Sequence, residues 1–257
     1  MTRETGLAAI AFATLVCAPR ASKAKCAYQR VEAFPPASAR LPVNGRIVVE
    51  GYGEAQSMVK AIATHHPELW AEGDRVSLRV VETNVGDFRL TQAVLVPERP
   101  LLPKTRYTLR IYESDLPVSD DSEIKLRDTF AWTTGSGADH GTPHWQAPPQ
   151  TGKRVYEELG CGPEIYVEVS VSVADPSPFQ VRAELRPVGG GPTHRYLLQP
   201  QHGVIEIGHG MCSGPFELSD GRSYTVTLTA VGVGGNISPA PGPVLQIASP
   251  GPKDGAR

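Results

Sequence analysis

The feature that most constrains the fold is a run of residues whose side chains alternate between two kinds. Ile165–Val173 reads Ile-Tyr-Val-Glu-Val-Ser-Val-Ser-Val, with a β-branched apolar side chain at every odd position. Because successive side chains of a β-strand point to opposite faces, this period of two predicts a strand with one buried and one wet face. Shorter runs repeat the pattern at Val76–Val80, Tyr107–Ile111 and Tyr224–Ala230. Strands therefore recur along most of the chain.

Glycine and proline residues lie between these runs. The chain has 26 Gly and 24 Pro among 257 residues, without the Gly-x-y period of collagen. Turn-forming clusters lie between the strand-like runs at Pro42–Gly45, Gly189–Pro192 and Ser219–Gly221. Short antiparallel strands joined by such turns are typical of β-sandwiches. A helical pattern occurs at Gln56–Thr64, stopped by Pro67, and is too short to define a fold. We predict an all-β chain.

One polar segment divides the chain. Thr134–Pro143 consists mostly of Gly, Ser, Thr, Asp and Pro and has no long apolar side chain, which predicts a linker at residues 135–143. Each flanking part is long enough to bury a core of its own. The predicted organisation is one sandwich at residues 25–134, a second at 144–250, and a disordered tail at 251–257.

A short sequence motif occurs once in each half. Leu101 precedes Tyr107 by six residues, Leu218 precedes Tyr224 by the same spacing, and each tyrosine opens an alternating strand after a turn. In Greek-key sandwiches such a tyrosine can form a tyrosine corner, with its ring in the core and its hydroxyl bonded to backbone just upstream. We predict structural tyrosine corners at Tyr107 and Tyr224. The alternative is that both are ordinary strand aromatics.

The first half carries a family resemblance. Residues from about 36 to 135 resemble a bacterial Ig-like domain of the S-layer-protein type, with Pro42–Glu50 at the start, Leu101–Tyr107 late and Phe130–Gly135 at the end. The segment Gly51–Trp70 departs from that pattern. The resemblance implies an Ig-like sandwich in which this segment forms a decorated loop.

The second half is similar to a fibronectin type III-like domain. The residues that carry this resemblance are Leu218–Tyr224 and Ala230–Ser238. Together the two resemblances imply a spacer, adhesion or interaction module of an exported bacterial protein, with no catalytic residues to carry over. Because a fold alone does not assign a function, the molecular target stays open.

The N-terminus has the pattern of a secretory signal peptide. Residues 1–24 carry an apolar run at Gly6–Ala18 and end with small residues at Ser22 and Ala24, so cleavage is expected before Lys25. The apolar run is shorter than the roughly 20 residues that span a bilayer as a helix. We expect an exported protein that is secreted, periplasmic or on the outer cell surface, and that does not span the membrane.

Four cysteines are distributed over the chain. Removal of the signal peptide leaves Cys26, Cys161 and Cys212, an odd number that permits one bridge in an oxidising compartment. We predict a disulfide between Cys161 and Cys212, since both lie beside glycine just outside strand-like runs. The role of Cys26 is left open, and the alternative is three thiols. Acylation of Cys17, as in a lipoprotein, is a further alternative.

Charge and motif content exclude several functions. The formal net charge is −2, which lacks the basic surface that a nucleic-acid binder needs. No nucleophile elbow, zinc-protease helix or phosphate-binding loop occurs. His140 and His144 lie in or next to the predicted linker, and the acidic run Ser119–Glu123 lacks the spacing of a calcium loop. We expect no metal, no cofactor and no enzymatic activity.

Three tryptophans offer one alternative to a purely structural function. Flat aromatic rings stack on sugars, which makes Trp70, Trp132 and Trp145 candidate sugar-stacking residues. The main hypothesis is a non-enzymatic interaction or scaffold protein of the cell envelope or medium, with an unknown protein or cell-surface glycan partner. The alternative is a carbohydrate- or peptidoglycan-binding accessory module.

Overall fold

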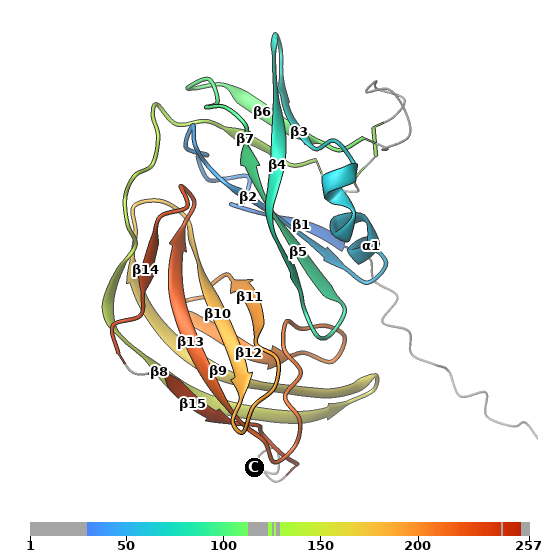
Figure 1. The fold of residues 1–257 in the computed structure, drawn as a ribbon, viewed down its shortest axis with the longest axis vertical. Coiled ribbons are helices and arrows are strands. Elements are labelled where there is room, and N and C mark those ends of the chain that lie inside the picture. Colours follow the sequence, from blue (N-terminus) through green and yellow to red (C-terminus); the bar gives the residue numbers. More distant parts are fainter. Residues whose placement is uncertain (1–29, 113–122, 125, 127–128, 243, 253–257) are drawn as a thin grey trace, which may run out of the picture.

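The structure is a computed structural model that describes residues 30–112, 123–124, 126, 129–242 and 244–252. The described part is all-β and its strands pair antiparallel, with one short α-helix and one 3-10 turn. The strands form two sandwich-like units (Figure 1). The predicted signal peptide, Cys17, Cys26 and most of the predicted tail lie outside the described residues.

The N-terminal unit, residues 30–134, is one sheet that folds over itself. Its elements are β1 (Arg30–Phe34), β2 (Ile47–Tyr52), α1 (Ala55–Lys60), η1 (Ile62–Thr64), β3 (Glu68–Ala71), β4 (Asp74–Val85), β5 (Leu90–Pro97), β6 (Arg106–Arg110) and β7 (Ala131–Thr133). The strand order is β1-β2-β5-β4-β3-β6-β7. The first part of β4 pairs with β3 and the rest pairs with β5, with a bulge between Val80 and Glu82. A long bulged strand therefore belongs to both layers of this unit.

The two ends of the folded sheet meet at Leu41. Its N–H donates to the carbonyl of Thr133 and its carbonyl accepts from the N–H of Gly135, which forms a parallel bridge to Thr134. Inside, aliphatic side chains from both layers surround the fully buried Trp132 and Tyr107. The unit thus has its own closed core.

The segment Gly51–Trp70, which departs from the Ig-like sequence pattern, contains the predicted helical turn. The prediction at Gln56–Thr64 is confirmed as α1 followed by η1, and Val59 and Ile62 from its apolar face are buried in the core. The chain then returns as β3, which pairs with β4 and β6. The helical segment packs on the core because its apolar side chains, spaced at helical intervals, lie on one face that must be buried.

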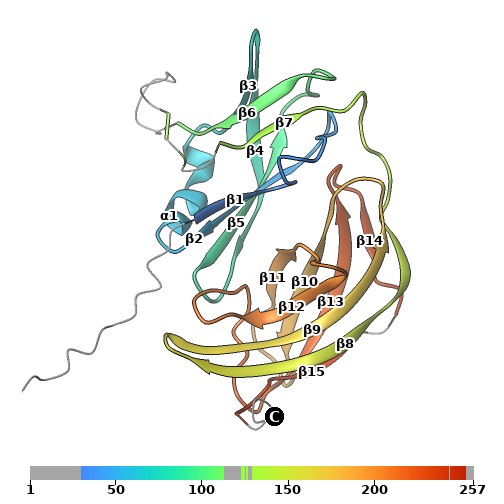
Figure 2. The same ribbon diagram turned by 180° about the vertical axis from the view of Figure 1, so that it is seen from behind.

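The C-terminal unit, residues 144–252, is a sandwich of two sheets. Its strands are β8 (His144–Leu159), β9 (Gly162–Ala174), β10 (Phe179–Pro187), β11 (His194–Leu198), β12 (Val204–His209), β13 (Ser223–Gly232), β14 (Ile237–Pro239) and β15 (Leu245–Ala248). One sheet has the order β12-β9-β8, and the other has β11-β10-β13-β14 with β15 also paired to β13 (Figure 2). A second core lies between the sheets.

The alternating run identified in the sequence forms the middle of β9. Val167, Val169 and Val171 are buried in the second core, whereas Ser170 and Ser172 are exposed on the outer face. The predicted strand is therefore confirmed, with the predicted face inward. The β-branched valines suit a pleated surface that is buried on one side.

Both tyrosines of the repeated sequence motif have buried rings and hydrogen-bonded hydroxyls. The hydroxyl of Tyr107 accepts a hydrogen bond from the N–H of Leu102 at 3.0 Å, and that of Tyr224 accepts from the N–H of Ser219 at 2.8 Å. The acceptor lies five residues after the donor in both cases. This is the geometry of a tyrosine corner. The leucines that precede them are buried as well, at Leu101 and Leu218.

Removal of the two hydroxyls is expected to have unequal effects. Tyr107 also donates to the carboxylate of Asp74, so Tyr107→Phe is expected to lower the free energy of unfolding by about 2–3 kcal/mol. Tyr224→Phe loses one neutral hydrogen bond and is expected to cost about 1 kcal/mol. Urea denaturation measures both. Tyr166→Phe, on a ring that is only half-buried, is the control, and equal losses for all three variants would rule the corners out.

The predicted bridge between Cys161 and Cys212 is wrong. Cys161 lies at the tip of the β8–β9 hairpin and is not part of a disulfide, whereas Cys212 is disulfide-bonded. After β12 the chain turns, with the N–H of Gly210 donating to the carbonyl of Ser213 at 2.9 Å. It then pairs with the N-terminal unit at Gly214. Cys161, at the hairpin tip, and Cys212, in the segment after β12, therefore lie in different loops of the C-terminal unit.

Candidate functional site

The main polar and apolar cluster outside the two cores lies where the units meet. Strands β1, β2 and β5 face β10, β11 and β13 across this interface (Figures 1 and 2). Five apolar side chains from the two sides are buried together: Phe34, Val48, Val94, Leu197 and Val231. Removing apolar area from water stabilises a contact by about 25 cal/mol per Å². The burial of these five side chains therefore favours a fixed contact between the units over independent motion.

The composition of β2 and β5 explains why they can serve two contacts. Ile47 and Val49 point into the first core, while Val48 between them points into the interface. In β5, Leu95 packs in the core and Val94 in the interface. Strands buried on both faces have continuous apolar runs instead of alternation. The continuous apolar runs of β2 and β5 therefore indicate, from the sequence alone, that both strands are buried on both faces.

Gln92 clamps the two units together through β11. Its Nε2 donates to the carbonyl of Leu197 at 2.8 Å, and its Oε1 accepts from the N–H of Leu197 at 3.1 Å. The side chain is only 2% exposed. The backbone of Leu197 lies on the outer edge of its sheet, since β11 pairs with β10 alone. One amide thus satisfies both groups of an edge residue that is buried away from water.

A carboxylate continues this network. Oε2 of Glu50 accepts from Gln92 Nε2 at 2.8 Å and from the Tyr196 hydroxyl at 2.9 Å. Burial raises the pKa of Glu50, and the hydrogen bonds from Tyr196 and Gln92 oppose that rise. Burial, together with the charge of Glu50, also raises the pKa of Tyr196, so its hydroxyl keeps the proton that it donates.

The shift at Glu50 gives a pH prediction. The folded state binds the proton more tightly than the unfolded state, so the stabilisation is complete below about pH 4.5 and is lost as pH rises through the raised pKa. Glu50→Gln keeps an acceptor and removes the charge. We expect the variant to be more stable than the parent at pH 7.5 and equal to it near pH 4, as measured by thermal melting. An equal difference at both pH values would contradict the assignment.

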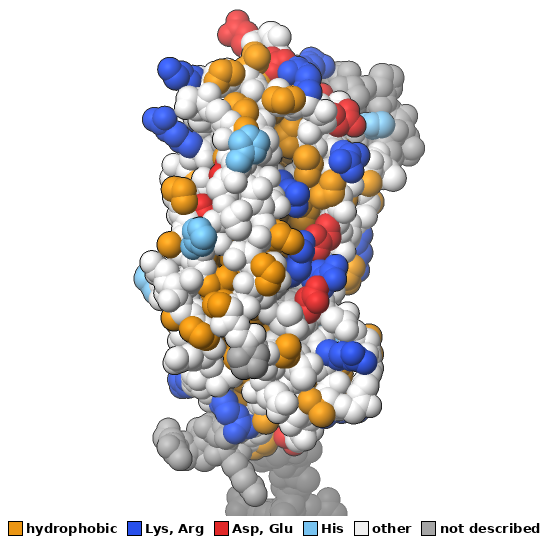
Figure 3. Space-filling view, turned by 60° about the vertical axis from the view of Figure 1, so that its left-hand side comes forward, with side chains coloured by type: hydrophobic (Ala, Val, Ile, Leu, Met, Phe, Trp, Pro, Cys, Tyr) orange, Lys and Arg blue, Asp and Glu red, His pale blue; other side chains and the backbone are white. Residues whose placement is uncertain are grey.

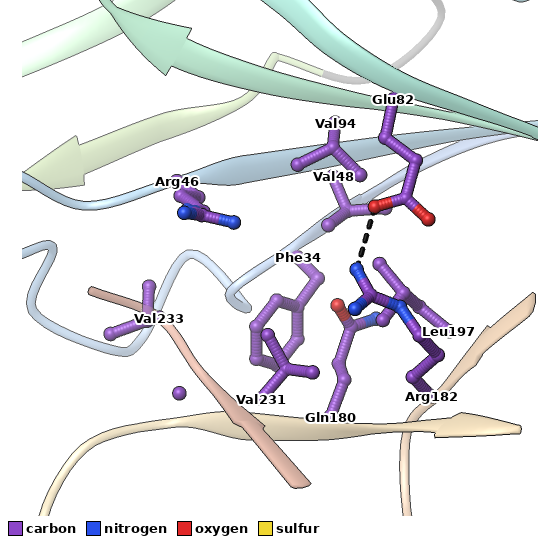
Figure 4. Close-up of a pocket in the computed structure, with 11 residues that line it drawn as sticks. Phe34, Arg46, Val48, Glu82, Val94, Gln180, Arg182, Leu197, Val231 and Val233 are labelled. Atoms are coloured by element: carbon purple, nitrogen blue, oxygen red, sulfur yellow. Dashed lines mark hydrogen bonds and ion pairs between the residues drawn. The ribbon is translucent and has the colours of Figure 1, made fainter. Parts of the chain in front are cut away.

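An ion pair and a histidine–carboxylate contact also cross the interface. Arg182 of β10 and Glu82 of β4 approach to 2.6 Å (Figure 4), and His194 of β11 lies 2.5 Å from Asp87 in the β4–β5 turn. The side chains of Arg182 and Glu82 are each 20% exposed, so the pair is partly desolvated. Such pairs fix orientation more than they add stability.

Backbone pairing joins the units at a second place. The N–H of Phe88 donates to the carbonyl of Gly214 at 3.1 Å, and the N–H of Gly214 donates back at 2.8 Å. Next to this bridge, a carboxylate oxygen of Asp87 accepts from the N–H of Glu217 at 3.0 Å. The tip of the β4–β5 hairpin is thereby held by the loop that follows β12.

The predicted linker is bonded to both units. The N–H of Asp139 donates to Asn44 Oδ1 at 2.8 Å, and its carbonyl accepts from Asn44 Nδ2 at 2.9 Å. The same carbonyl accepts from Asn236 Nδ2 at 3.3 Å. Asn44 belongs to the N-terminal unit and Asn236 to the C-terminal unit. The segment therefore acts as a brace between the units and not as a free tether.

Two of the cavities in the part of the chain that the structure describes lie along the interface. The smaller, about 20 Å³, is bounded by Phe34, Val231 and the Arg182–Glu82 pair (Figure 4) and has room for about one water. The larger measures about 220 Å³. Glu50 and Tyr196 line it together with residues from both units.

The three tryptophans do not form a common platform. Trp132 is 0% exposed and its Nε1 donates to the carbonyl of Pro35 at 2.8 Å, so the prediction of a sugar-stacking role for Trp132 is wrong. Trp132 lies on β7 and its ring is buried in the first core, so neither face of the ring is open to a ligand. Trp145 is half-buried against the second core and bonded to Ser238, and the ring of Trp70 is covered by the Arg110 guanidinium at 4.3 Å.

The remaining polar groups form no recognisable chemical centre in the part of the chain that the structure describes. Within the described ranges, no set of three or more His, Cys, Asp or Glu side chains is arranged to hold a metal ion. His140 and His144 are both exposed. On the face drawn in Figure 3, basic and acidic side chains are interspersed and not gathered by sign. No helix among the described residues has the length and apolar character needed to cross a bilayer.

No protein family and no curated protein matches the chain. Among solved structures, pullulanase type I from Bacillus subtilis str. 168, complexed with maltose, is 11% identical with a TM-score of 0.26, covering 79% of this chain and 24% of that protein. The N-terminal part of the bacterial S-layer protein SbsC is 13% identical with a TM-score of 0.24, covering 80% and 41%. The chain thus spans less than half of each.

Proposed function

We propose that this chain is a non-enzymatic interaction or scaffold module of an exported bacterial protein. In this proposal an Ig-like N-terminal unit and a fibronectin type III-like C-terminal unit are held in one fixed arrangement. The observation that carries it is the interface, in which Gln92 bonds both backbone groups of Leu197 while Glu50 and Tyr196 bond each other. Polar groups that join two units in this way fix how the units are oriented relative to one another.

The topology supports the finer assignment of the units. In the C-terminal unit the first, second and fifth strands share one sheet, and the third, fourth and sixth share the other. This distribution is compatible with a fibronectin type III-like sandwich. In the N-terminal unit, the parallel bridge between Leu41 and Thr134 joins the first and last segments of the sandwich, which supports an Ig-like assignment.

A fixed arrangement suits a module that presents surfaces at a set spacing. Interfaces between domains of one chain commonly permit relative motion unless they are extensive and well bonded. Here the apolar cluster, the Gln92 clamp, the Arg182–Glu82 ion pair, the His194–Asp87 contact and the Asp139 brace all oppose such motion. A scaffold benefits from this rigidity because a partner then meets both units without an entropic cost of orienting them.

Localisation is tested by intact mass. The protein is recovered from the medium, envelope and cytoplasm of the cells that make it. We expect a chain that starts at Lys25 in the first two fractions. A chain that starts at Met1 and is confined to the cytoplasm would contradict export.

The scaffold role is tested by cross-linking on intact cells followed by mass spectrometry. Gln92→Ala should reduce cross-links to any partner that contacts both units, whereas Gln246→Ala, on the exposed face of β15, should not. Cross-links that are the same in all three proteins would show that the fixed arrangement is not what the partner recognises.

A further inference from the structure

The larger interface cavity is a candidate ligand site that does not depend on the scaffold proposal. Its volume of about 220 Å³ equals roughly seven water molecules at ~30 Å³ each. Pockets for drug-sized molecules are larger, at about 300–1,000 Å³. An occupant would therefore have about as many non-hydrogen atoms as a single six-membered ring with one substituent.

The wall of the cavity is acidic and apolar. Glu32 and Glu50 line it, and no Lys, Arg or His is among its described lining residues. Its other polar side chains are neutral: Gln92, Gln180, Tyr196, Gln199 and Gln201. Phe34 and Leu198 contribute apolar surface from opposite units. The charge that complements such a wall is positive.

Glu50 has hydrogen-bond capacity beyond its two neutral donors. Both of these hydrogen bonds fall on Oε2, and both donors, Gln92 and Tyr196, are uncharged. Glu32 differs, since Arg30 forms an ion pair with it at 2.5 Å on the outer strand. Among the described residues, Glu50 is thus the carboxylate of the cavity that lacks a directly bonded cation.

We propose that this cavity binds a small organic cation with a primary ammonium group, which pairs with the Glu50 carboxylate while its carbon skeleton packs against Phe34 and Leu198. An ammonium has three donors and a full charge, so it matches an acceptor that neutral donors leave partly unsatisfied. The ligand would contact both units at once. Its binding would then also stabilise the arrangement of the units by mass action.

The charged groups around Glu50 set the pH dependence of binding. Burial and Glu32 raise the pKa of Glu50, while Tyr196, Gln92 and Arg30 lower it. The ionised carboxylate is the form that pairs with an ammonium. Affinity is therefore expected to increase as pH rises through the pKa of Glu50, and to be weaker at pH 5 than at pH 7.5.

Isothermal titration with two matched probes tests the proposal. Cyclohexylammonium and cyclohexanol have the same ring and differ in charge, so only the ammonium should use Glu50. We expect cyclohexylammonium to bind the full chain at pH 7.5 at least tenfold more tightly than cyclohexanol does. Glu50→Gln should lower that affinity at least tenfold, and Glu98→Gln, a carboxylate outside the cavity, should not.

Every other outcome contradicts the proposal. Equal affinity for the two probes would make the cavity an apolar void without charge selectivity. No binding of either probe would exclude a site for this class of ligand. Undiminished binding to Glu50→Gln would place the ammonium elsewhere. Thermal melting of each variant checks folding, and Glu50→Gln retains an acceptor for both donors, so loss of binding can be separated from loss of fold.

Discussion

Gln92→Ala is expected to lower the free energy of unfolding by about 3–5 kcal/mol, because it removes three hydrogen bonds made by a buried side chain. The truncation leaves the N–H and the carbonyl of Leu197 without their partner and removes a donor from Glu50. Each unsatisfied buried group costs about 1–3 kcal/mol. Urea denaturation of the full chain measures the loss.

The same variant should also change the shape of the transition. With the clamp in place, the two units are expected to unfold together, and without it the calorimetric transition should separate into two. Gln246→Ala removes an exposed glutamine of β15 and is expected to stay within about 0.5 kcal/mol of the parent. A loss below about 1 kcal/mol for Gln92→Ala, with one sharp transition retained, would show that the clamp does not couple the units.

Trp132→Ala is expected to destabilise the protein by about 3–5 kcal/mol, the range for removing a fully buried large aromatic side chain. The ring is enclosed by the first core, and its Nε1 bonds the carbonyl of Pro35, which would lose its donor. Trp70→Ala is the matched comparison. Its ring lies under Arg110 on a partly exposed strand, so a loss of about 1–2 kcal/mol is expected.

These two variants also decide how the carbohydrate alternative is tested. A change in glycan binding by Trp132→Ala would follow from unfolding, so Trp70 is the informative position. Loss of binding on a glycan array for Trp70→Ala, with its stability nearly intact, would favour the alternative function. Near-parental stability of Trp132→Ala would instead contradict the buried position of that ring.

Regular alternation made much of the fold predictable. A strand with one wet face imposes its period on the sequence, so the buried valines of β9 can be identified from the order of the residues alone. The spacing of Leu101 and Tyr107, repeated at Leu218 and Tyr224, likewise depends on local geometry. Features set by a few neighbouring residues are the ones that sequence patterns record.

The interface could not be predicted in the same way. Gln92 and Leu197 are 105 residues apart, and Glu50 and Tyr196 are 146 apart, so no local pattern links them. The signal that existed was the apolar run Ile47–Val49, which indicates burial on both faces without naming what covers the second face. The disulfide prediction failed for a similar reason, since the spacing of cysteines along the sequence does not say which pair meets in the fold.

We propose that the two units form one rigid body through this interface. Residual dipolar couplings of backbone amides in the full chain test this rigidity, because each unit reports its own alignment tensor. We expect one tensor to fit residues 30–112 and 144–242 together, with the orientation of the units seen in the structure. Two tensors of different magnitude, one for each unit, would show that the units move independently and would contradict the scaffold account.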